Sequence, residues 1–544
     1  RAAGIGTFGA SNNNIITGKN GVGIFAEASN ITLDSNTFTV ETQDNGVGLW
    51  GMDNTLVADN AQDANGYSAH NKIFQYNYNG GMKKNGFAMA FGAKHGGTSK
   101  NYMDIKFNNQ GSSAGTTIVD LQNAATRTKG TEAGIVGILV NTNNGTDKVY
   151  NYGKIEEEDT TSKTSLRAYG ALVNQGTFRN FGDITLAESL LHQANDVERA
   201  DMDKVNVGIR ANGLSDDGTT GGINTTIVNH GDITIGTADS TDPAHKTNIG
   251  SWAIYGYNVT TGKKADGKNS NIVINRNSYG VYSGDGNVDI ADTNIKVGND
   301  TVLGHVMFEG VRSDGTTTFA ITRQPAGANS ITTPASAAPL PNGYADPNDL
   351  LSKLDTPRET DAAIGVYIDS AATRGRTVKV NADMDIDRFS HGIVLAERND
   401  NTKGGDTTVN LGGKINLASN KVAGGQVHST APTTTTVVPE EVYEQGNAVY
   451  YYSADSRSKA TSYANVTMNG DYNTAYYTKG GVTLEKGGSI DLRSKYDVDL
   501  RETNANHKDV GYGSVGIVSA NKDVASINKG TIITGLSDIH DVPA

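Results

Sequence analysis

Two copies of one short stretch decide the fold: Asn180-Phe181-Gly182-Asp183-Ile184-Thr185-Leu186 and Asn229-His230-Gly231-Asp232-Ile233-Thr234-Ile235. In each copy, apolar and polar residues alternate after the aspartate, which is typical of a β-strand with one buried face. The asparagine and glycine before the strand favour a tight corner, because both accept left-handed backbone conformations. Each copy therefore predicts a corner followed by a short strand.

Related copies extend this pattern along the chain. Further copies begin at Asn151 and Asn528, and degenerate ones cover 413–417 and 488–492. A second tag, a small-Gly-apolar-apolar motif, alternates with the first, and its glycines include Gly23, Gly48, Gly137, Gly170, Gly208, Gly280, Gly365, Gly392 and Gly516. Uninterrupted neighbours lie 25 residues apart (Gly23 to Gly48) or 27 apart (Gly365 to Gly392). The chain is therefore a repeat with a period of about 25 residues.

A coil of two or three short strands cannot bury its apolar face alone, so coils of this length must stack. We therefore predict an all-β parallel solenoid of about 14–18 coils, with strands about 4.8 Å apart along its axis. The asparagines suit this fold, because stacked amides form hydrogen-bonded ladders along such an axis. The alternative is an array of antiparallel β-sandwiches, which predicts frequent turn signals but no tag that repeats at coil length.

Composition narrows the class of protein. Among 544 residues, 46 Lys and Arg oppose 59 Asp and Glu, so the formal net charge is −13, which disfavours nucleic-acid binding. The longest apolar run, 135–140, is too short to span a membrane. There is no cysteine, which excludes disulfides and Cys-ligated zinc and suits a chain that crosses an oxidising periplasm unfolded. The chain starts inside the repeat without a signal peptide, so we expect a fragment of a longer precursor.

Four segments depart from the repeat, and such insertions project from a solenoid, where binding sites are common. They are 59–110, rich in aromatic residues; 187–204, with helical apolar spacing; 309–360, with six of the ten prolines; and 420–446, with a threonine run between prolines. Within 309–360 we take Arg323, Asn342 and Tyr344 as candidate ligand contacts. The alternative for each segment is a surface loop without a partner.

The chain contains no motif of a serine hydrolase, zinc protease or phosphate-binding loop, and its ten histidines have no metal-ligand spacing. We therefore expect neither catalysis nor a cofactor. Asp383, Asp385 and Asp387 are the weak exception, because alternate residues of a strand share one face. They are candidates for a calcium site or for the acid and base of a polysaccharide-cleaving β-helix enzyme. The alternative is an ordinary solvent face, with Met384 and Ile386 pointing inward.

Tyrosines near the C-terminal end form the other candidate binding site. Tyr450, Tyr451 and Tyr452 are consecutive, so strand geometry must turn at least one of them outward. Three more complete the strip: Tyr472, Tyr476 and Tyr477. Outward aromatic rings beside amides and carboxylates hold sugars by stacking. The alternative is that these tyrosines pack on one another as an external ladder.

The two heptapeptide copies, together with Val-Gly-Ile-Phe at 22–25 and Val-Gly-Ile-Val at 515–518, resemble the passenger of a type V autotransporter. The cysteine-free composition, rich in Asn, Gly and Tyr, is similar to that of the very large fusobacterial autotransporter adhesins. The resemblance implies a right-handed β-helix displayed on the bacterial surface and anchored by a C-terminal outer-membrane barrel of the same precursor. It also implies adhesion to host-cell glycans or protein receptors, including those of immune cells, and to partner bacteria.

We therefore expect a fragment of a surface adhesin, with 309–360 as the first candidate for the contact and the tyrosine strip as the second. Two alternatives remain open. One is a rigid spacer whose binding site lies elsewhere in a larger protein. The other is a polysaccharide-cleaving enzyme that uses Asp383, Asp385 and Asp387 together with Arg388.

Overall fold

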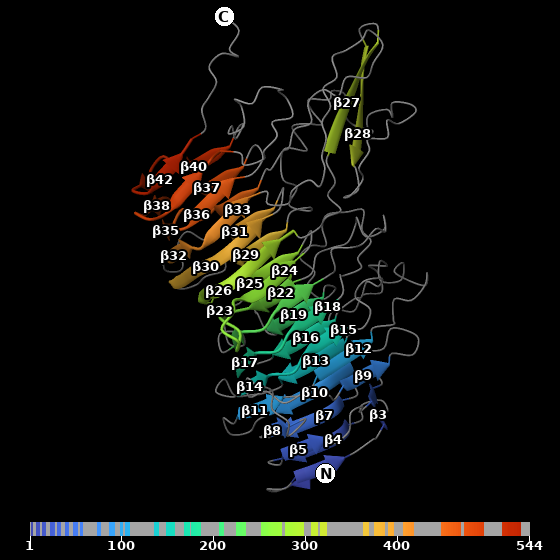
Figure 1. Cartoon of the computed structure of the whole chain (residues 1–544). Helices are drawn as coiled ribbons and strands as arrows, with labels where there is room; N and C mark the ends of the chain where they lie inside the picture. The colour runs from blue at the N-terminus through green and yellow to red at the C-terminus, as the bar shows by residue number, and fades with distance from the viewer. Residues whose placement is uncertain are drawn as a thin grey trace, which may run out of the picture.

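The computed structural model describes the β-strands named in this subsection. It also describes the side chains of residues 22–25, 48–49, 99–101, 104–105, 136–140, 148–157, 168–173, 176–186, 206–211, 225–235, 252–274, 278–284, 286–298, 363–368, 375–386, 390–396, 406–417, 448–468, 473–493 and 514–534. All of this is strand, turn or irregular backbone, and the strands stack in chain order from one end of the molecule to the other (Figure 1).

One face of the stack is a parallel sheet of 14 strands, which we call sheet A. Each strand after β1 carries one copy of the second tag or its equivalent. The strands are β1 (Ala2–Ala3), β4 (Val22–Glu27), β7 (Val47–Met52), β10 (Gly86–Gly92), β13 (Ile135–Val140), β16 (Tyr169–Val173), β19 (Val207–Ala211), β22 (Trp252–Gly256), β25 (Tyr279–Ser283), β29 (Ile364–Ile368), β31 (His391–Leu395), β34 (Val449–Ser453), β37 (Thr474–Thr478) and β40 (Val515–Ser519).

A 24-stranded sheet, sheet B, folds around the other side of the coils in two rows. The first row holds β2 (Thr7–Ala10), β5 (Asn30–Leu33), β8 (Thr55–Val57), β11 (Thr98–Asn101), β14 (Lys148–Asn151), β17 (Gly176–Asn180), β20 (Thr225–Asn229), β23 (Asn258–Thr261), β32 (Thr407–Gly412), β35 (Ser458–Ser462), β38 (Val482–Leu484) and β41 (Ile527–Asn528). The second row holds β9 (Ile73–Asn77), β12 (Asp104–Asn108), β15 (Ile155–Glu157), β18 (Ile184–Leu186), β21 (Ile233–Ile235), β24 (Ser270–Ile274), β33 (Lys414–Leu417), β36 (Asn465–Met468), β39 (Ser489–Asp491) and β42 (Thr531–Ile533).

Two long strands, β26 (Val288–Val297) and β30 (Arg376–Ile386), run through both rows of sheet B. Two pairs stand outside the large sheets: β3 (Asn14–Thr17) with β6 (Thr39–Thr42), and the antiparallel hairpin of β27 (Val306–Ser313) and β28 (Thr316–Arg323). Figure 1 shows this hairpin apart from the stacked coils. Among the described strands it is the one antiparallel pair.

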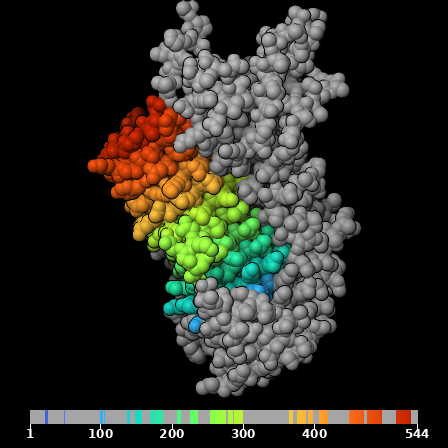
Figure 2. Space-filling view, viewed as in Figure 1, coloured from blue at the N-terminus to red at the C-terminus, as the bar shows by residue number. Residues whose placement is uncertain are grey.

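The three rows of strands enclose one continuous apolar core. Ile209 of sheet A and Ile227 and Ile233 of sheet B are all fully buried in it. Successive coils contribute such residues to the core. In Figure 2 the coloured atoms from teal to red form one continuous body. The predicted parallel β-helix is therefore confirmed, and the alternative of antiparallel sandwiches is wrong.

A ladder of buried asparagines holds the corner between the two rows of sheet B. The Nδ2 atom of Asn101 donates to Oδ1 of Asn151 at 2.8 Å, Asn151 donates to Asn180 at 2.8 Å, and Asn180 donates to Asn229 at 2.9 Å. Asn180 Nδ2 also donates to the carbonyl oxygen of Gly182 at 2.6 Å, and the neighbouring rungs repeat this bond. The predicted amide ladder is confirmed.

The left-handed backbone expected at this corner occurs at Gly413 of a degenerate copy, where φ is 97°, but not in the two full copies. Among the described residues other than glycine, a positive φ occurs at Asp292 alone, and neither Gly182 nor Gly231 has one. Glycine is required at 182 for another reason: a Cβ there would lie 1.9 Å from the carbonyl oxygen of Gly153 in the coil below. Close approach between coils, rather than a left-handed backbone, therefore selects glycine at 182 and 231.

The longest connections leave the helix at one corner, between the second row of sheet B and the next strand of sheet A. They are 109–134, 187–206, 236–251, 298–363, 418–448 and 492–514. The predicted insertions 187–204 and 420–446 lie outside the described residues, and of 309–360 the structure describes only the end of β27 and β28. The segment 59–110 supplies β9 to β12, three of which pair within sheet B and one within sheet A.

Candidate binding surface

Sheet A presents two columns of apolar and aromatic side chains on its outer face. Parallel pairing without a shift places equivalent residues of successive strands side by side. The first column holds Val136, Tyr169, Val207, Trp252, Tyr279 and Ile364. The second column holds Leu139, Leu172, Arg210, Tyr255, Tyr282, Tyr367, Val394, Tyr452 and Tyr477. Most of these residues form a second apolar cluster, separate from the core.

In the strands of sheet A, two consecutive residues face the core, and this breaks the usual alternation of inward and outward side chains. In β19 a Cβ at Gly208 would point inward, 3.0 Å from the Cγ2 atom of Ile233, and the next residue, Ile209, also lies in the core. The residues on either side, Val207 and Arg210, therefore face outward. Because the tag repeats in each coil, so does the break, and two outward columns result.

The same break corrects the prediction for the tyrosine strip. Tyr450 occupies the glycine position of the tag and Tyr451 the isoleucine position, as their pairing with β31 shows, and both are fully buried. Tyr476 pairs with Tyr451 and is also fully buried. Tyr450, Tyr451 and Tyr476 are therefore excluded as ligand contacts, whereas the expectation that at least one of residues 450–452 faces outward is confirmed at Tyr452. An alignment of the tags places Tyr450 at the position of Gly392, and this alignment could have predicted from the sequence that Tyr450 and Tyr451 face inward.

Tyr452 and Tyr477 do face outward. Their rings are partly exposed and stack with centroids 5.0 Å apart and planes 12° apart. For this pair the alternative reading, an external ladder, is confirmed. Three other predicted contacts, Tyr472, Asn342 and Tyr344, lie outside the described residues, as does the side chain of Arg323 at the end of β28.

The largest aromatic group lies in the middle of the two columns. Tyr255 stacks on Tyr282 at 4.7 Å, and Tyr282 stacks on Tyr367 at 5.2 Å. Trp252, in the first column, lies 4.7 Å from Tyr279 and 4.8 Å from Tyr282. Because Tyr282 has a tyrosine ring on each face, no sugar can stack on it. Ring edges, rather than faces, are what this ladder offers to a partner.

A cation continues the aromatic group along the sheet. The guanidinium carbon of Arg210 lies 5.0 Å from the centroid of the Tyr169 ring, and its Nη1 atom donates a hydrogen bond to the Tyr169 hydroxyl at 2.5 Å. Arginine over a tyrosine face is a favourable cation–π arrangement. Tyrosine, tryptophan and arginine are also the residue types most enriched at the energetic centres of protein interfaces.

The outer face of sheet B differs in character. Along its second row the outward residues are Thr185, Thr234, Val273, Lys296, Asp385 and Asn416. Only one of these is apolar. The first column of sheet A is buried, with its residues 0–8% exposed, so the partly exposed second column is the part of this face that a partner can reach. Sheet A, therefore, carries the candidate binding surface.

The carboxylates of β30 face solvent, as the alternative reading predicts. Met384 and Ile386 are buried, Asp383 is exposed and Asp385 is partly exposed. Asp383 Oδ1 accepts a hydrogen bond from the Lys414 backbone at 2.8 Å, and Asp385 Oδ1 accepts one from Asn416 Nδ2 at 2.7 Å. Within the described part of the chain, no three acidic or histidine side chains gather as a metal site. Asp387 and Arg388 lie outside that part.

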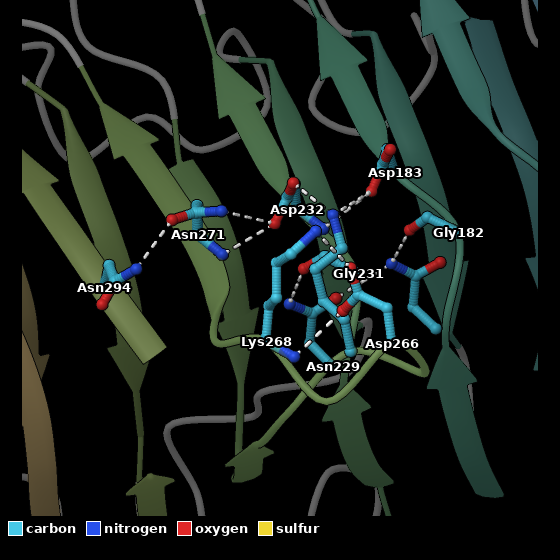
Figure 3. A network of polar contacts seen from close by, with 11 residues as sticks. Gly182, Asp183, Asn229, Gly231, Asp232, Asp266, Lys268, Asn271 and Asn294 are labelled. Atoms are coloured by element: carbon cyan, nitrogen blue, oxygen red, sulfur yellow. Dashed lines mark hydrogen bonds and ion pairs between the residues drawn. The ribbon is translucent and has the colours of Figure 1, made fainter. Parts of the chain in front are cut away.

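A polar network at the corner of sheet B ties three coils together (Figure 3). Asp232 Oδ1 accepts hydrogen bonds from the backbone and the side chain of Asn271 at 2.8 and 2.9 Å. Lys264, from the turn between β23 and β24, places Nζ 2.6 Å from Asp232 Oδ2 and 3.7 Å from Asp183 Oδ1. Burial lowers the pKa of Lys264, but its hydrogen bond to Asp232 and the charges of both aspartates outweigh that effect and raise it. Lys264 is therefore a structural ammonium rather than a nucleophile.

Alkaline pH is expected to destabilise the helix through its buried tyrosines. Burial raises the pKa of Tyr451 to about 12 and also raises the pKa of Tyr450 and Tyr476. An unfolded tyrosine loses its proton near pH 10, so stability present below about pH 10 is lost as the pH rises towards 12. Tyr451 alone accounts for about 3 kcal/mol. The urea midpoint of unfolding, measured between pH 10 and pH 12, should fall less steeply with pH for Tyr451→Phe than for the unmodified chain. The control Tyr477→Phe, which changes an outward ring, should fall as steeply as the unmodified chain. Equal slopes in all three proteins would contradict the prediction.

The comparisons with known proteins identify no relative. No family model matches the chain, and neither the curated proteins nor the solved structures contain a match. In the described residues, no helix has the length and apolar character needed to cross a membrane.

Proposed function

We propose that this chain is the β-helical passenger of a bacterial surface adhesin and that the outer face of sheet A contacts the receptor. One observation carries the proposal: the partly exposed second column of sheet A is mostly apolar and aromatic, whereas the outward residues in the second row of sheet B are mostly polar. Tyr255, Tyr282 and Tyr367 form the continuous centre of this surface. The tags that resemble autotransporter passengers support its placement on the cell surface.

The arrangement of Asp383 and Asp385 favours a binding function over a catalytic one. An acid and base pair in a glycoside-cleaving enzyme needs two carboxyl groups that face the scissile bond. Asp383 and Asp385 instead each accept a hydrogen bond from the next coil. We propose a host-cell glycan or protein receptor as the partner, which would contact mainly the ring edges and Arg210, the neighbour of Tyr255 in the second column.

A rigid spacer is the second candidate, and the asparagine ladder favours it. Buried amide bonds run through four successive coils, so bending the rod there would break hydrogen bonds in the dry interior. Such a segment would hold a distant binding site away from the cell surface without contacting the receptor itself.

Cell binding by the purified rod tests the proposal. The double variant Tyr282→Ser/Tyr367→Ser should bind epithelial or immune cells about tenfold more weakly or worse, because truncating a tyrosine at the energetic centre of an interface costs about 2 kcal/mol or more, and about 1.4 kcal/mol corresponds to a factor of ten. The matched control is Tyr463→Ser, which removes a tyrosine that is 55% exposed but lies away from both columns. Competition with free sugars distinguishes a glycan receptor from a protein receptor.

Two results would reject this surface as the contact. If deletion of 309–360 abolishes binding and the double variant keeps it, the receptor contacts the insertion instead. If the intact, folded rod binds no cells, the spacer becomes the leading function.

A further inference from the structure

We propose that the outward tyrosine ladder is a site of oxidative cross-linking, in which peroxide and a peroxidase join tyrosines of adjacent coils as dityrosine. The pair Tyr452 and Tyr477 is the clearest case, and the stack of Tyr255, Tyr282 and Tyr367 is the second. This modification does not depend on adhesion, so either proposal can fail without the other.

Stacking supplies the geometry. Tyr452 and Tyr477 occupy the same position in paired strands, so parallel pairing holds their rings 5.0 Å apart. Both rings are partly exposed. Two radicals formed on such a pair meet within one molecule, because the strands already hold the rings in contact.

Among the side chains that the structure describes, few compete with these tyrosines for an oxidant. It contains no cysteine. Of the methionines whose side chains the structure describes, Met384 is 1% exposed and Met468 is fully buried. Trp252 is 5% exposed, and its ring lies 5.0 Å or less from Tyr255, Tyr279 and Tyr282. A radical formed on this tryptophan can therefore pass to a tyrosine of the ladder.

The chemistry balances with one peroxide for each cross-link. Each phenol loses one electron and one proton and becomes a phenoxyl radical, whose unpaired electron is shared with the ring carbons ortho to the oxygen. Two ortho carbons then form a carbon–carbon bond, and the hydrogens on those carbons move to the two oxygens. The protein loses two hydrogen atoms in total, and they reduce the peroxide to two molecules of water.

The structure also contains two internal comparisons. Tyr450 and Tyr476 have ring centroids 5.6 Å apart, but both are fully buried, and their planes are 75° apart. Tyr463 is 55% exposed, and within the described residues no other aromatic ring contacts it. Cross-linking through stacked, accessible rings should omit both of these sites.

The test treats the folded chain, at low protein concentration, with hydrogen peroxide and horseradish peroxidase. We expect dityrosine fluorescence at a yield per molecule that does not change on dilution. Mass spectrometry of the digest should find a peptide pair that joins Tyr452 to Tyr477 and is lighter by two hydrogens. Tyr477→Phe should remove this pair, Tyr463→Phe should retain it, and oxidation in urea should abolish it.

Three results would overturn the proposal. One is a folded protein that gives no intramolecular dityrosine. Another is a product found only as covalent dimers whose yield rises with protein concentration. The third is a Tyr452–Tyr477 cross-link that forms equally well in urea, which would show that the fold does not direct it. If the cross-link forms as expected, the oxidised rod should also unfold at a higher urea concentration than the untreated rod.

Discussion

Replacing Gly182 by alanine is expected to destabilise the helix by on the order of 3 kcal/mol, because overpacking between coils displaces backbone. The added Cβ would lie 1.9 Å from the carbonyl oxygen of Gly153 and 2.6 Å from its carbonyl carbon. Neither atom belongs to a flexible side chain, so the two coils must move apart. Urea unfolding measures the loss, and amide exchange by mass spectrometry should locate it in β14 to β21.

Gly516→Ala is the matched control for Gly182→Ala. Gly516 is a glycine of the second tag, in β40, where the atoms nearest to an added Cβ belong to the side chains of Ile490 and Ile532, at 3.7 to 3.9 Å. These are ordinary contacts, so we expect a urea midpoint close to that of the unmodified chain. If both substitutions lower the free energy of unfolding equally, the close approach between neighbouring coils does not select glycine at 182.

Asn180→Ala is expected to cost about 2–5 kcal/mol, because it leaves two buried polar groups without a partner. Asn180 is fully buried, accepts from Asn151 and donates to Asn229. Alanine removes these two bonds and also the one that Asn180 donates to the carbonyl oxygen of Gly182. Faster amide exchange should spread to the strands on both sides, because each coil contacts only its neighbours.

The control for this variant is Asn410→Ala. Asn410 is partly exposed on the outward side of β32, where water can replace the amide, so we expect a change within about 0.5 kcal/mol. If Asn180→Ala is as mild as this control, the ladder does not stabilise the corner.

Much of the fold follows from the sequence because a solenoid repeats one local pattern. Ile184-Thr185-Leu186 alternates as a strand does, and the structure makes it β18. The interior amide ladder could also be expected, because asparagine recurs at one position of the tag and stacked coils bring equal positions together. Glycine at 182 was expected too, but for the wrong reason, since the distance between neighbouring coils is a tertiary quantity.

The candidate site was harder to predict. Simple alternation suggests that Tyr450 and Tyr452 share a face, but the break at the glycine position turns Tyr450 and Tyr451 inward together. The aromatic group around Tyr282 was not predicted, because its members are far apart in the sequence. Tyr282 and Tyr367 become neighbours only when β25 pairs with β29 across the long connection 298–363.

The sequence by itself determined that this chain forms short parallel strands, repeats about every 25 residues and lines one corner with asparagines. The local alternation of apolar and polar residues and the spacing of the tags carry that information, and the same pattern gives the same structure in each coil. Only the tertiary structure decided which tyrosines face solvent and which rings stack. Those outcomes depend on the register between coils and on the local break in each strand of sheet A, and both arise when separate coils pack together.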